Sequence, residues 1–197
     1  MFISFEGIDG SGKSTQAKLL AEELGEDAVL VREPGGTAAS ERIRDLLADP
    51  AVPLDRFTEL LLFCAARAQL IEEVIQPALD AGRTVICDRY CDSSIAYQGA
   101  GRGLGMTRVA ELVEQATGGL EPDLTLLIRI SPEVAIERSR GGDRFESEGI
   151  EFQRAIARAY DEIATRHPDR VVVIDGEQDV DVVTAEVREV VWQRRTS

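Results

Sequence analysis

The stretch FEGIDGSGKST, residues 5–15, decides the architecture of this 197-residue chain. Its centre, GIDGSGKS, fits the pattern G-x-x-x-x-G-K-S/T and stands between an apolar run at residues 2–6 and a helical pattern at residues 13–24. The glycines let successive backbone N–H groups turn toward one centre, and a helix N-terminus adds partial positive charge there. The stretch therefore predicts a phosphate-binding loop rather than an ordinary glycine-rich turn.

Each part of this loop has an expected task. Lys13 would reach the β- and γ-phosphates of a nucleotide, and the Ser14 hydroxyl would ligate Mg²⁺. The residues expected to bind ATP here are Gly7, Ile8, Asp9, Gly10, Ser11, Gly12, Lys13, Ser14 and Thr15. Because such loops serve switches, motors, transporters and kinases alike, the remaining motifs must decide among them.

Apolar strands alternate with helices along the rest of the chain. Strands are expected at residues 2–6, 28–32, 84–88, 124–130 and 171–175. Helices are expected at residues 13–24, 55–81, about 90–98, 150–166 and about 180–194. A short helix should end at about Leu47, another should run from a Thr107 cap to Gly118, and a third should begin at Ser131-Pro132. A loop is expected at 99–105. This order predicts an α/β fold, a five-stranded parallel sheet with helices on both faces, in one domain over residues 1–197.

Composition excludes several classes of function. The net charge of −14, from 22 basic and 36 acidic residues, argues against a nucleic-acid-binding surface. Neither a membrane-length apolar run nor a leader pattern is apparent, so we expect a cytoplasmic protein. The three cysteines form no C-x-x-C pair and are expected to be reduced structural thiols, and His167 is expected in a surface loop. Asparagine is absent, which removes any asparagine-dependent guanine-recognition motif.

A second phosphate site is predicted where the strand TVICD ends. Ligands gather at the carboxyl ends of strands in open α/β sheets, so Asp88 is expected near Mg²⁺, through its water shell. Arg89 follows and can fork onto a phosphate. The alternative is a surface Asp–Arg pair.

Two helices carry side chains suited to a nucleotide. Phe63 and Arg67 are four residues apart and share a face, where a ring and a guanidinium suit a base or a phosphate. Alternatively, Phe63 belongs to the core and Arg67 to a structural ion pair. Ser94, Tyr97 and Gln98 share another face and carry groups that read a base or a sugar.

Arginines also surround a glycine pair after residue 137. Arg138, Arg140 and Arg144 flank Gly141-Gly142, which suggests a closing lid at about residues 139–148 that brings positive charge to transferring phosphate. The alternative is a solvated charge run.

The chain resembles the bacterial thymidylate kinases over nearly its whole length. The resemblance rests on FEGIDGSGKST, on REPGGT at residues 32–37, on DRYCDSSIAYQGAGRG at 88–103 and on PDLTLLI at 122–128. It implies a P-loop nucleoside monophosphate kinase fold and Mg²⁺-dependent phosphorylation of dTMP by ATP, which yields dTDP for dTTP biosynthesis. It also implies a homodimer with a helical interface.

The same resemblance implies an acceptor site made of Asp9, Glu33, Pro34, Arg44, Phe63, Arg67, Arg89, Ser94, Tyr97 and Gln98. In it, Phe63 would stack on thymine, and Arg67 would bond a thymine carbonyl. Ser94 and Gln98 would address the base edge, and Tyr97 would exclude a ribose 2′-hydroxyl. Arg89, with Arg44, would hold the phosphate. Asp9 would meet the sugar 3′-hydroxyl, and Glu33 and Pro34 would shape the wall.

The resemblance implies Lys13, Arg89 and a lid arginine as the catalytic residues. Some members of the family carry an arginine in the loop at the position of Gly10, and others carry it on the lid. This chain is similar to the second kind, with Arg144 preferred over Arg140. The adenine would rest between the lid base near Arg138 and the loop after Asp175. Other nucleotide or deoxynucleoside kinases, a nucleotide-controlled switch and an inactive paralogue remain alternatives.

Overall fold

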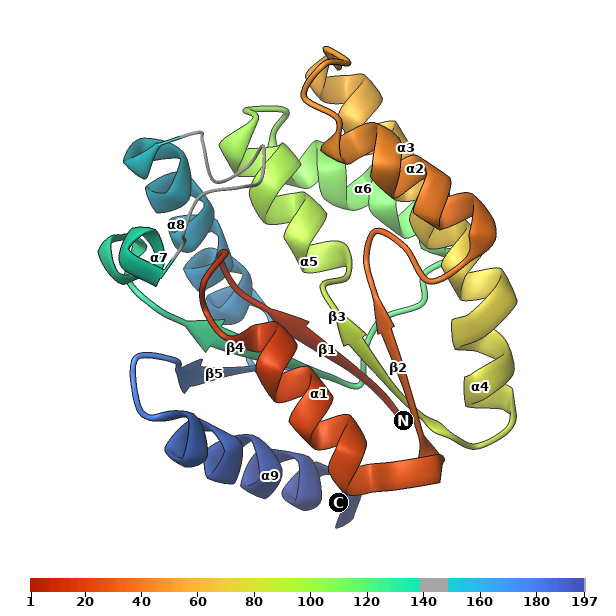
Figure 1. Ribbon diagram of the computed structural model, residues 1–197, viewed down its shortest axis with the longest axis vertical. Helices are drawn as coiled ribbons and strands as arrows, with labels where there is room; N and C mark the ends of the chain where they lie inside the picture. Colours follow the sequence, from red (N-terminus) through yellow and green to blue (C-terminus); the bar gives the residue numbers. More distant parts are fainter. Residues whose placement is uncertain (139–148, 197) are drawn as a thin grey trace.

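The computed structural model describes residues 1–138 and 149–196 and contains one five-stranded sheet (Figure 1). Its strands are β1 (Phe2–Glu6), β2 (Ala28–Arg32), β3 (Thr84–Asp88), β4 (Leu124–Arg129) and β5 (Val171–Asp175). They pair in the order β2-β3-β1-β4-β5, and every pairing is parallel. The predicted α/β fold is confirmed. The lid predicted at residues 139–148, with Arg140 and Arg144, lies outside the described residues.

Burial on both faces explains why the strands are almost uninterrupted apolar runs. Every residue of the central strand β1 is buried. Ile3 and Phe5 face one core, whereas Phe2 faces the other and meets the Tyr90 ring edge-on at 4.9 Å. Parallel strands need covered faces because their crossover connections run over them.

Helices cover the two faces of the sheet. The helices α1 (Lys13–Leu24) and α9 (Val180–Thr196) lie side by side over one face (Figure 1). Leu20 of α1 and Val187 of α9 pack into the core on that face. The other face is covered by α8 (Ile150–Arg166), α4 (Gln76–Asp80) and the segment after β3.

The helical region predicted at residues 55–81 is not one regular α-helix. It consists of α3 (Arg56–Leu70), a π-helical turn η2 (Ile71–Ile75) and α4. Asp55 caps α3 by accepting a hydrogen bond from the Phe57 N–H at 2.8 Å. Pro77 has no N–H to donate to the preceding turn, so the α-helical ladder is interrupted at this point.

The prediction of a loop at residues 99–105 was wrong over its first half. The short helix α5 (Cys91–Ser94) continues into a π-helical segment, η3 (Ile95–Gly101). Glycines serve here for close packing: a Cβ on Gly101 would lie 2.7 Å from the Phe152 ring. The next helix, α6 (Met106–Thr117), starts after Gly105 and not at a Thr107 cap, and it ends at Gly118 as predicted.

The remaining helices, α2 (Ala38–Ala48) and α7 (Pro132–Arg138), match their predictions, and Thr37 caps α2. The 3₁₀ turn η1 (Gly25–Asp27) between α1 and β2 was not predicted. His167 ends α8 and is exposed, and all three cysteines are free thiols. No helix in the described ranges is long and apolar enough to cross a membrane.

Candidate active site

The predicted phosphate loop connects β1 to α1 and passes over the end of β4. Gly7 has φ +144°, and a Cβ at this position would lie 2.4 Å from the Ile128 carbonyl oxygen. Only glycine fits there, because both the backbone angle and the neighbouring strand exclude a side chain. Ser11 is buried inside the loop, and its Oγ has no hydrogen-bond partner among the described residues.

Lys13 stands at the first position of α1 and is buried. Its Nζ donates to the Ile8 carbonyl oxygen at 3.3 Å and lies 3.7 Å from an Asp9 carboxylate oxygen. Burial, together with the nearby positive charge of Arg89, lowers the pKa of Lys13 to about 8. The loop therefore holds the amine where phosphate oxygens of a nucleotide would meet it.

Arg89 is fixed from several sides directly after β3. Its guanidinium donates to the Gly7 carbonyl oxygen at 3.2 Å, to Ser93 Oγ at 3.1 Å, to the Tyr97 hydroxyl at 3.1 Å and to Asp9. The Tyr97 hydroxyl donates in turn to Asp9 at 3.0 Å. Burial opposes ionisation of Asp9, but the charges of Arg89 and Lys13 outweigh it and lower the pKa of Asp9. The result is a preformed cationic group beside the loop.

A cavity of about 370 Å³ opens next to Arg89 at the carboxyl ends of β1, β2 and β3. It is lined by Lys13, Ser14, Asp88 and all ten residues predicted for the acceptor site, namely Asp9, Glu33, Pro34, Arg44, Phe63, Arg67, Arg89, Ser94, Tyr97 and Gln98. Parallel strands bring their carboxyl ends to one edge of a sheet, which is why residues so distant in sequence meet.

Arg67 is buried on α3, where it forms the ion pair that was one of the two roles considered for it. Its Nε donates to Glu33 at 2.7 Å, and its Nη2 donates to the Tyr90 carbonyl oxygen at 3.0 Å and to Ser94 Oγ at 3.1 Å. Its Nη1 is buried and has no hydrogen-bond partner among the described residues. Burial raises the pKa of Glu33 to about 7, against the opposing effect of Arg67. The ion pair is thus present, and the two N–H groups of Nη1 remain for a ligand.

The residues around this pair give the cavity its wall. Glu33 is joined to Pro34 by a cis peptide bond. The Pro34 carbonyl oxygen accepts a hydrogen bond from Arg44 at 3.0 Å. Phe63, which could have belonged to the core, is only half-buried and lines the cavity.

Two of the cavity residues have the chemistry to hold Mg²⁺. Asp88 ends β3, and its Oδ1 is buried without a hydrogen-bond partner among the described residues. Ser14 is exposed in the first turn of α1. A carboxylate oxygen and a hydroxyl facing one space are hard oxygen ligands, which suit Mg²⁺ shared with phosphate oxygens.

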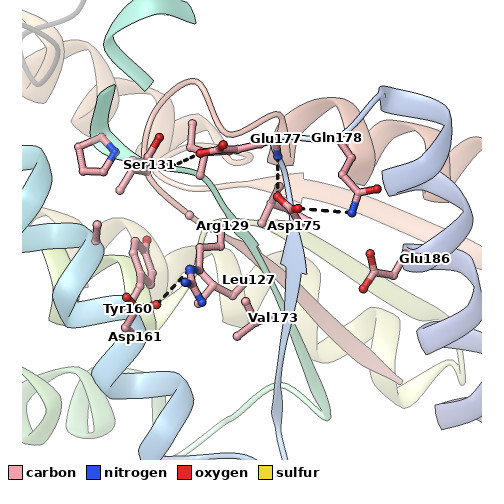
Figure 2. Close-up of a pocket in the computed structure, with 16 residues that line it drawn as sticks. Leu127, Arg129, Ser131, Tyr160, Asp161, Val173, Asp175, Glu177, Gln178 and Glu186 are labelled. Atoms are coloured by element: carbon pink, nitrogen blue, oxygen red, sulfur yellow. Dashed lines mark hydrogen bonds and ion pairs between the residues drawn. The ribbon is translucent and has the colours of Figure 1, made fainter. Parts of the chain in front are cut away.

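A second cavity, of about 690 Å³, lies at the ends of β4 and β5 (Figure 2). Glu177 accepts a hydrogen bond from the Ser131 N–H at 2.7 Å and donates its own N–H to Asp175 at 3.0 Å. Arg138 donates to the Gly176 carbonyl oxygen at 2.9 Å. The two segments predicted to hold adenine, the base of the lid and the loop after Asp175, are therefore in contact.

Gly10 lies against α7, the helix that precedes the predicted lid. A Cβ on Gly10 would lie 3.1 Å from the Ala135 carbonyl oxygen of α7. The loop therefore offers little room for a large side chain at this position.

Sequence reasoning missed two buried networks behind the site. Glu6, at the end of β1, accepts hydrogen bonds from Ser93 Oγ at 2.6 Å and from the Tyr160 hydroxyl at 2.9 Å. Glu59 of α3 accepts hydrogen bonds from Gln98 at 3.0 Å and from Arg102 at 3.2 Å. The available signal was an acidic residue within an apolar run, which requires a buried partner.

Comparison with known proteins agrees with this geometry. The family model described as thymidylate kinase matches residues 5–187. The thymidylate kinase of Synechococcus sp. strain JA-3-3Ab is 50% identical over 181 residues, which cover 89% of this chain and 87% of that protein. That of Caldanaerobacter subterraneus is 49% identical, with 91% and 88% covered. The crystal structure of thymidylate kinase from Ehrlichia chaffeensis has a TM-score of 0.82 and 38% identity, with 98% of both chains covered. The chain therefore belongs to the thymidylate kinase family.

Proposed function

We propose that this enzyme transfers the γ-phosphoryl group of ATP, held on residues 7–15, to the 5′-phosphate of dTMP in the 370 Å³ cavity. The products are ADP and dTDP, the precursor of dTTP. The observation that carries the proposal is that Lys13 of the phosphate loop and all ten predicted acceptor residues line this one cavity. Donor and acceptor phosphates would therefore meet without any rearrangement of the sheet.

The reaction needs alignment and charge rather than a general base. The second pKa of a phosphate monoester is about 6, so the attacking oxygen of dTMP is largely ionised at neutral pH. The negative charge of the two phosphate groups must then be neutralised as they approach. Lys13 would exchange its contacts with Ile8 and Asp9 for the β- and γ-phosphates of ATP.

Arg89 would hold the acceptor phosphate, with help from Arg44. Asp9, Ser93, Tyr97 and the Gly7 carbonyl oxygen already fix the guanidinium of Arg89, so little conformational entropy is lost when phosphate binds. A fork that is held before binding gives directional hydrogen bonds to phosphate. This arrangement supports a role in binding and in aligning the acceptor.

Mg²⁺ would be held by ATP phosphates together with Ser14 and, through water, Asp88. Its chemistry when bound is to neutralise charge on the β- and γ-phosphate oxygens. The Oδ1 of Asp88 supports this assignment, since it offers a lone pair that no donor among residues 1–138 and 149–196 uses. Ser14 contributes a hydroxyl from the first turn of α1.

The base and sugar assignments follow from the same cavity. Phe63 would stack on thymine, Arg67 would donate to a thymine carbonyl, and Ser94 and Gln98 would line the base edge. The hydrogen bond between Tyr97 and Asp9 would close the space beside the 2′-carbon, which supports a preference for deoxynucleotides.

Arg144 remains our candidate for the catalytic lid arginine, with Arg140 as the alternative. We take residues 139–148 as a lid within a single domain of residues 1–197. The contact of Gly10 with α7 supports this choice, because it disfavours an arginine within the loop itself. Arg138 at the lid base would adjoin the adenine.

A homodimer and a cytoplasmic location complete the proposal. The outer sides of α2 and α3 expose Leu46, Phe57 and Leu61 at 37%, 36% and 44%. These helices pack side by side at the edge of the molecule (Figure 1), so their apolar residues could be covered by a second copy. Sedimentation of the wild type and of Leu61→Glu would test the dimer.

The decisive experiment is a coupled ADP-release assay with ATP–Mg²⁺ and a panel of acceptors. We expect fast turnover with dTMP, slower turnover with dUMP, and almost none with dCMP, AMP, GMP or thymidine. Preference for another acceptor would leave a phosphate-loop kinase but discard the base assignments. Tight ATP binding without turnover of any acceptor would instead point to a switch or an inactive paralogue.

A further inference from the structure

A buried ion pair, Glu59 with Arg102, lies behind the acceptor cavity and contacts the side-chain amide of Gln98. Gln98 is 2% exposed and lines the cavity, and its Nε2 donates to Glu59 Oε1 at 3.0 Å. Its carbonyl oxygen accepts no hydrogen bond from the residues that the structure describes. An amide presents a donor at one end and an acceptor at the other, so its orientation decides which of them a ligand meets.

Glu59 permits only one of the two amide orientations. It is 1% exposed, and Arg102 donates to its two oxygens at 3.2 and 3.3 Å. Arg102 in turn lies over the Phe152 ring at 5.0 Å. Paired in this way with a guanidinium, Glu59 is a carboxylate, which can only accept hydrogen bonds. A reversed Gln98 amide would bring two acceptor oxygens together, so its carbonyl oxygen is directed away from Glu59.

The cavity therefore has a donor and an acceptor to match a base edge. In the described part of the chain, the buried Nη1 of Arg67 has no hydrogen-bond partner, and the carbonyl oxygen of Gln98 accepts no hydrogen bond. Thymine and uracil carry an acceptor at O4 and a donor at N3–H, whereas cytosine carries a donor at N4 and an acceptor at N3. A site that leaves a buried polar group unpaired rejects the wrong ligand strongly.

We propose that Glu59 is a positioning residue that makes the acceptor site select bases with an N3–H donor over cytosine. It acts through Gln98 and does not touch the substrate itself. The inference rests on the proposed function, since it concerns the base of the acceptor. The competing interpretation is that Glu59 and Arg102 only clamp α3 to the end of η3.

The test is the variant Glu59→Gln, whose neutral amide can donate to the Gln98 carbonyl oxygen and so allow the reversed orientation. Equilibrium binding of dTMP, dUMP and dCMP without ATP gives a readout independent of turnover, and kcat/KM with ATP–Mg²⁺ gives a second. A reversed Gln98 amide would present its N–H group to the N3–H of thymine, which would then lack an acceptor. We therefore expect the preference for dTMP over dCMP to fall at least about tenfold. The preference for dTMP over dUMP should not change, because both carry N3–H.

Asp92→Asn is the matched control. Asp92 forms another largely buried carboxylate–arginine pair, with Arg170 at 2.7 Å, and does not line the acceptor cavity. The Asp92→Asn substitution should lower the stability of the protein, as Glu59→Gln does, and leave its base preference unchanged. If Glu59→Gln does not fold, Gln98→Leu provides the test, because it removes the carbonyl oxygen and should also reduce discrimination against dCMP.

The outcomes separate this inference from the proposed function. A wild type that does not prefer dTMP would refute the proposed function. A wild type that prefers dTMP, together with a Glu59→Gln variant of unchanged preference, would overturn only the positioning role. Loss of affinity for all three nucleotides by the same factor would likewise show a structural clamp.

Discussion

The substitution Gly7→Ala tests whether the phosphate loop is held in place by its contact with β4. Two penalties are expected at this residue. Its φ of +144° belongs to a region that other residues avoid, and the new Cβ would lie 2.4 Å from the Ile128 carbonyl oxygen and 2.9 Å from Ser11 Oγ. The carbonyl belongs to a central strand, so the loop must move rather than the strand.

The magnitude follows from treating these penalties separately. Backbone strain costs about 1–3 kcal/mol, and overpacking against a fixed neighbour costs about 1–3 kcal/mol more. Gly7→Ala should therefore lower the free energy of unfolding by about 2–6 kcal/mol. Gly12→Ala is the matched control, because Gly12 has φ +90° but a Cβ there would meet nothing within 4 Å. It should show the backbone penalty alone, about 1–3 kcal/mol.

Urea unfolding of the wild type and of both variants would measure the difference. A domain of this size loses about 2–4 °C in Tm for each kcal/mol, so melting curves provide a second reading. Binding of dTMP should also weaken more in Gly7→Ala, because the Gly7 carbonyl oxygen accepts a hydrogen bond that helps to hold Arg89, the residue proposed to bind the acceptor phosphate. Equal destabilisation by the two substitutions would refute the reasoning, since it would leave no energetic role for the contact with Ile128.

Three further predictions concern charged residues. Burial lowers the pKa of Lys13 to about 8, so the free enzyme loses this positive charge as the pH rises through 8. Calorimetry should then show the Kd for ATP increasing above that pH by up to about tenfold per pH unit. A constant Kd from pH 7 to 9.5 would contradict this. Arg67→Met leaves Glu33 buried without its cation and should lower the free energy of unfolding by about 3–5 kcal/mol in urea, whereas a change below about 1 kcal/mol would mean that water reaches the pair. Arg144→Ala should lower kcat on the order of 10³-fold with little change in dTMP affinity; an unchanged kcat in single-turnover experiments would eliminate Arg144 and favour Arg140.

The fold could be predicted almost completely from local patterns. The five strands lie where apolar and β-branched runs predicted them. A parallel sheet buries both faces, so each strand is a nearly continuous apolar run that is easily located in the sequence. The phosphate loop is equally local, since its glycines, Lys13 and the following helix are consecutive. The resemblance to thymidylate kinases extended this to ten acceptor residues, and the structure brings all of them to one cavity.

The errors occurred where long-range packing decides local structure. Gly99 and Gly101 suggested a loop, yet the chain there stays helical because Met106 and Phe152 press against positions that have no side chain. Nothing between residues 99 and 105 contains that information, since Phe152 lies 51 positions after Gly101. The π-helical turn before Pro77 is a similar case, because period and composition alone resemble those of an ordinary helix.

The sequence by itself determined the parts of this protein whose chemistry is contiguous: the strands, the predicted phosphate loop and the class of reaction. Only the tertiary structure decided how the charged side chains pair. Glu59 of α3 meets Gln98 and Arg102 in and just after η3, and Arg67 of α3 meets Glu33 in the loop after β2. The physical reason is that a buried charge must find its counter-charge in space, and the partner is chosen by how the helices pack on the sheet and not by its distance along the chain.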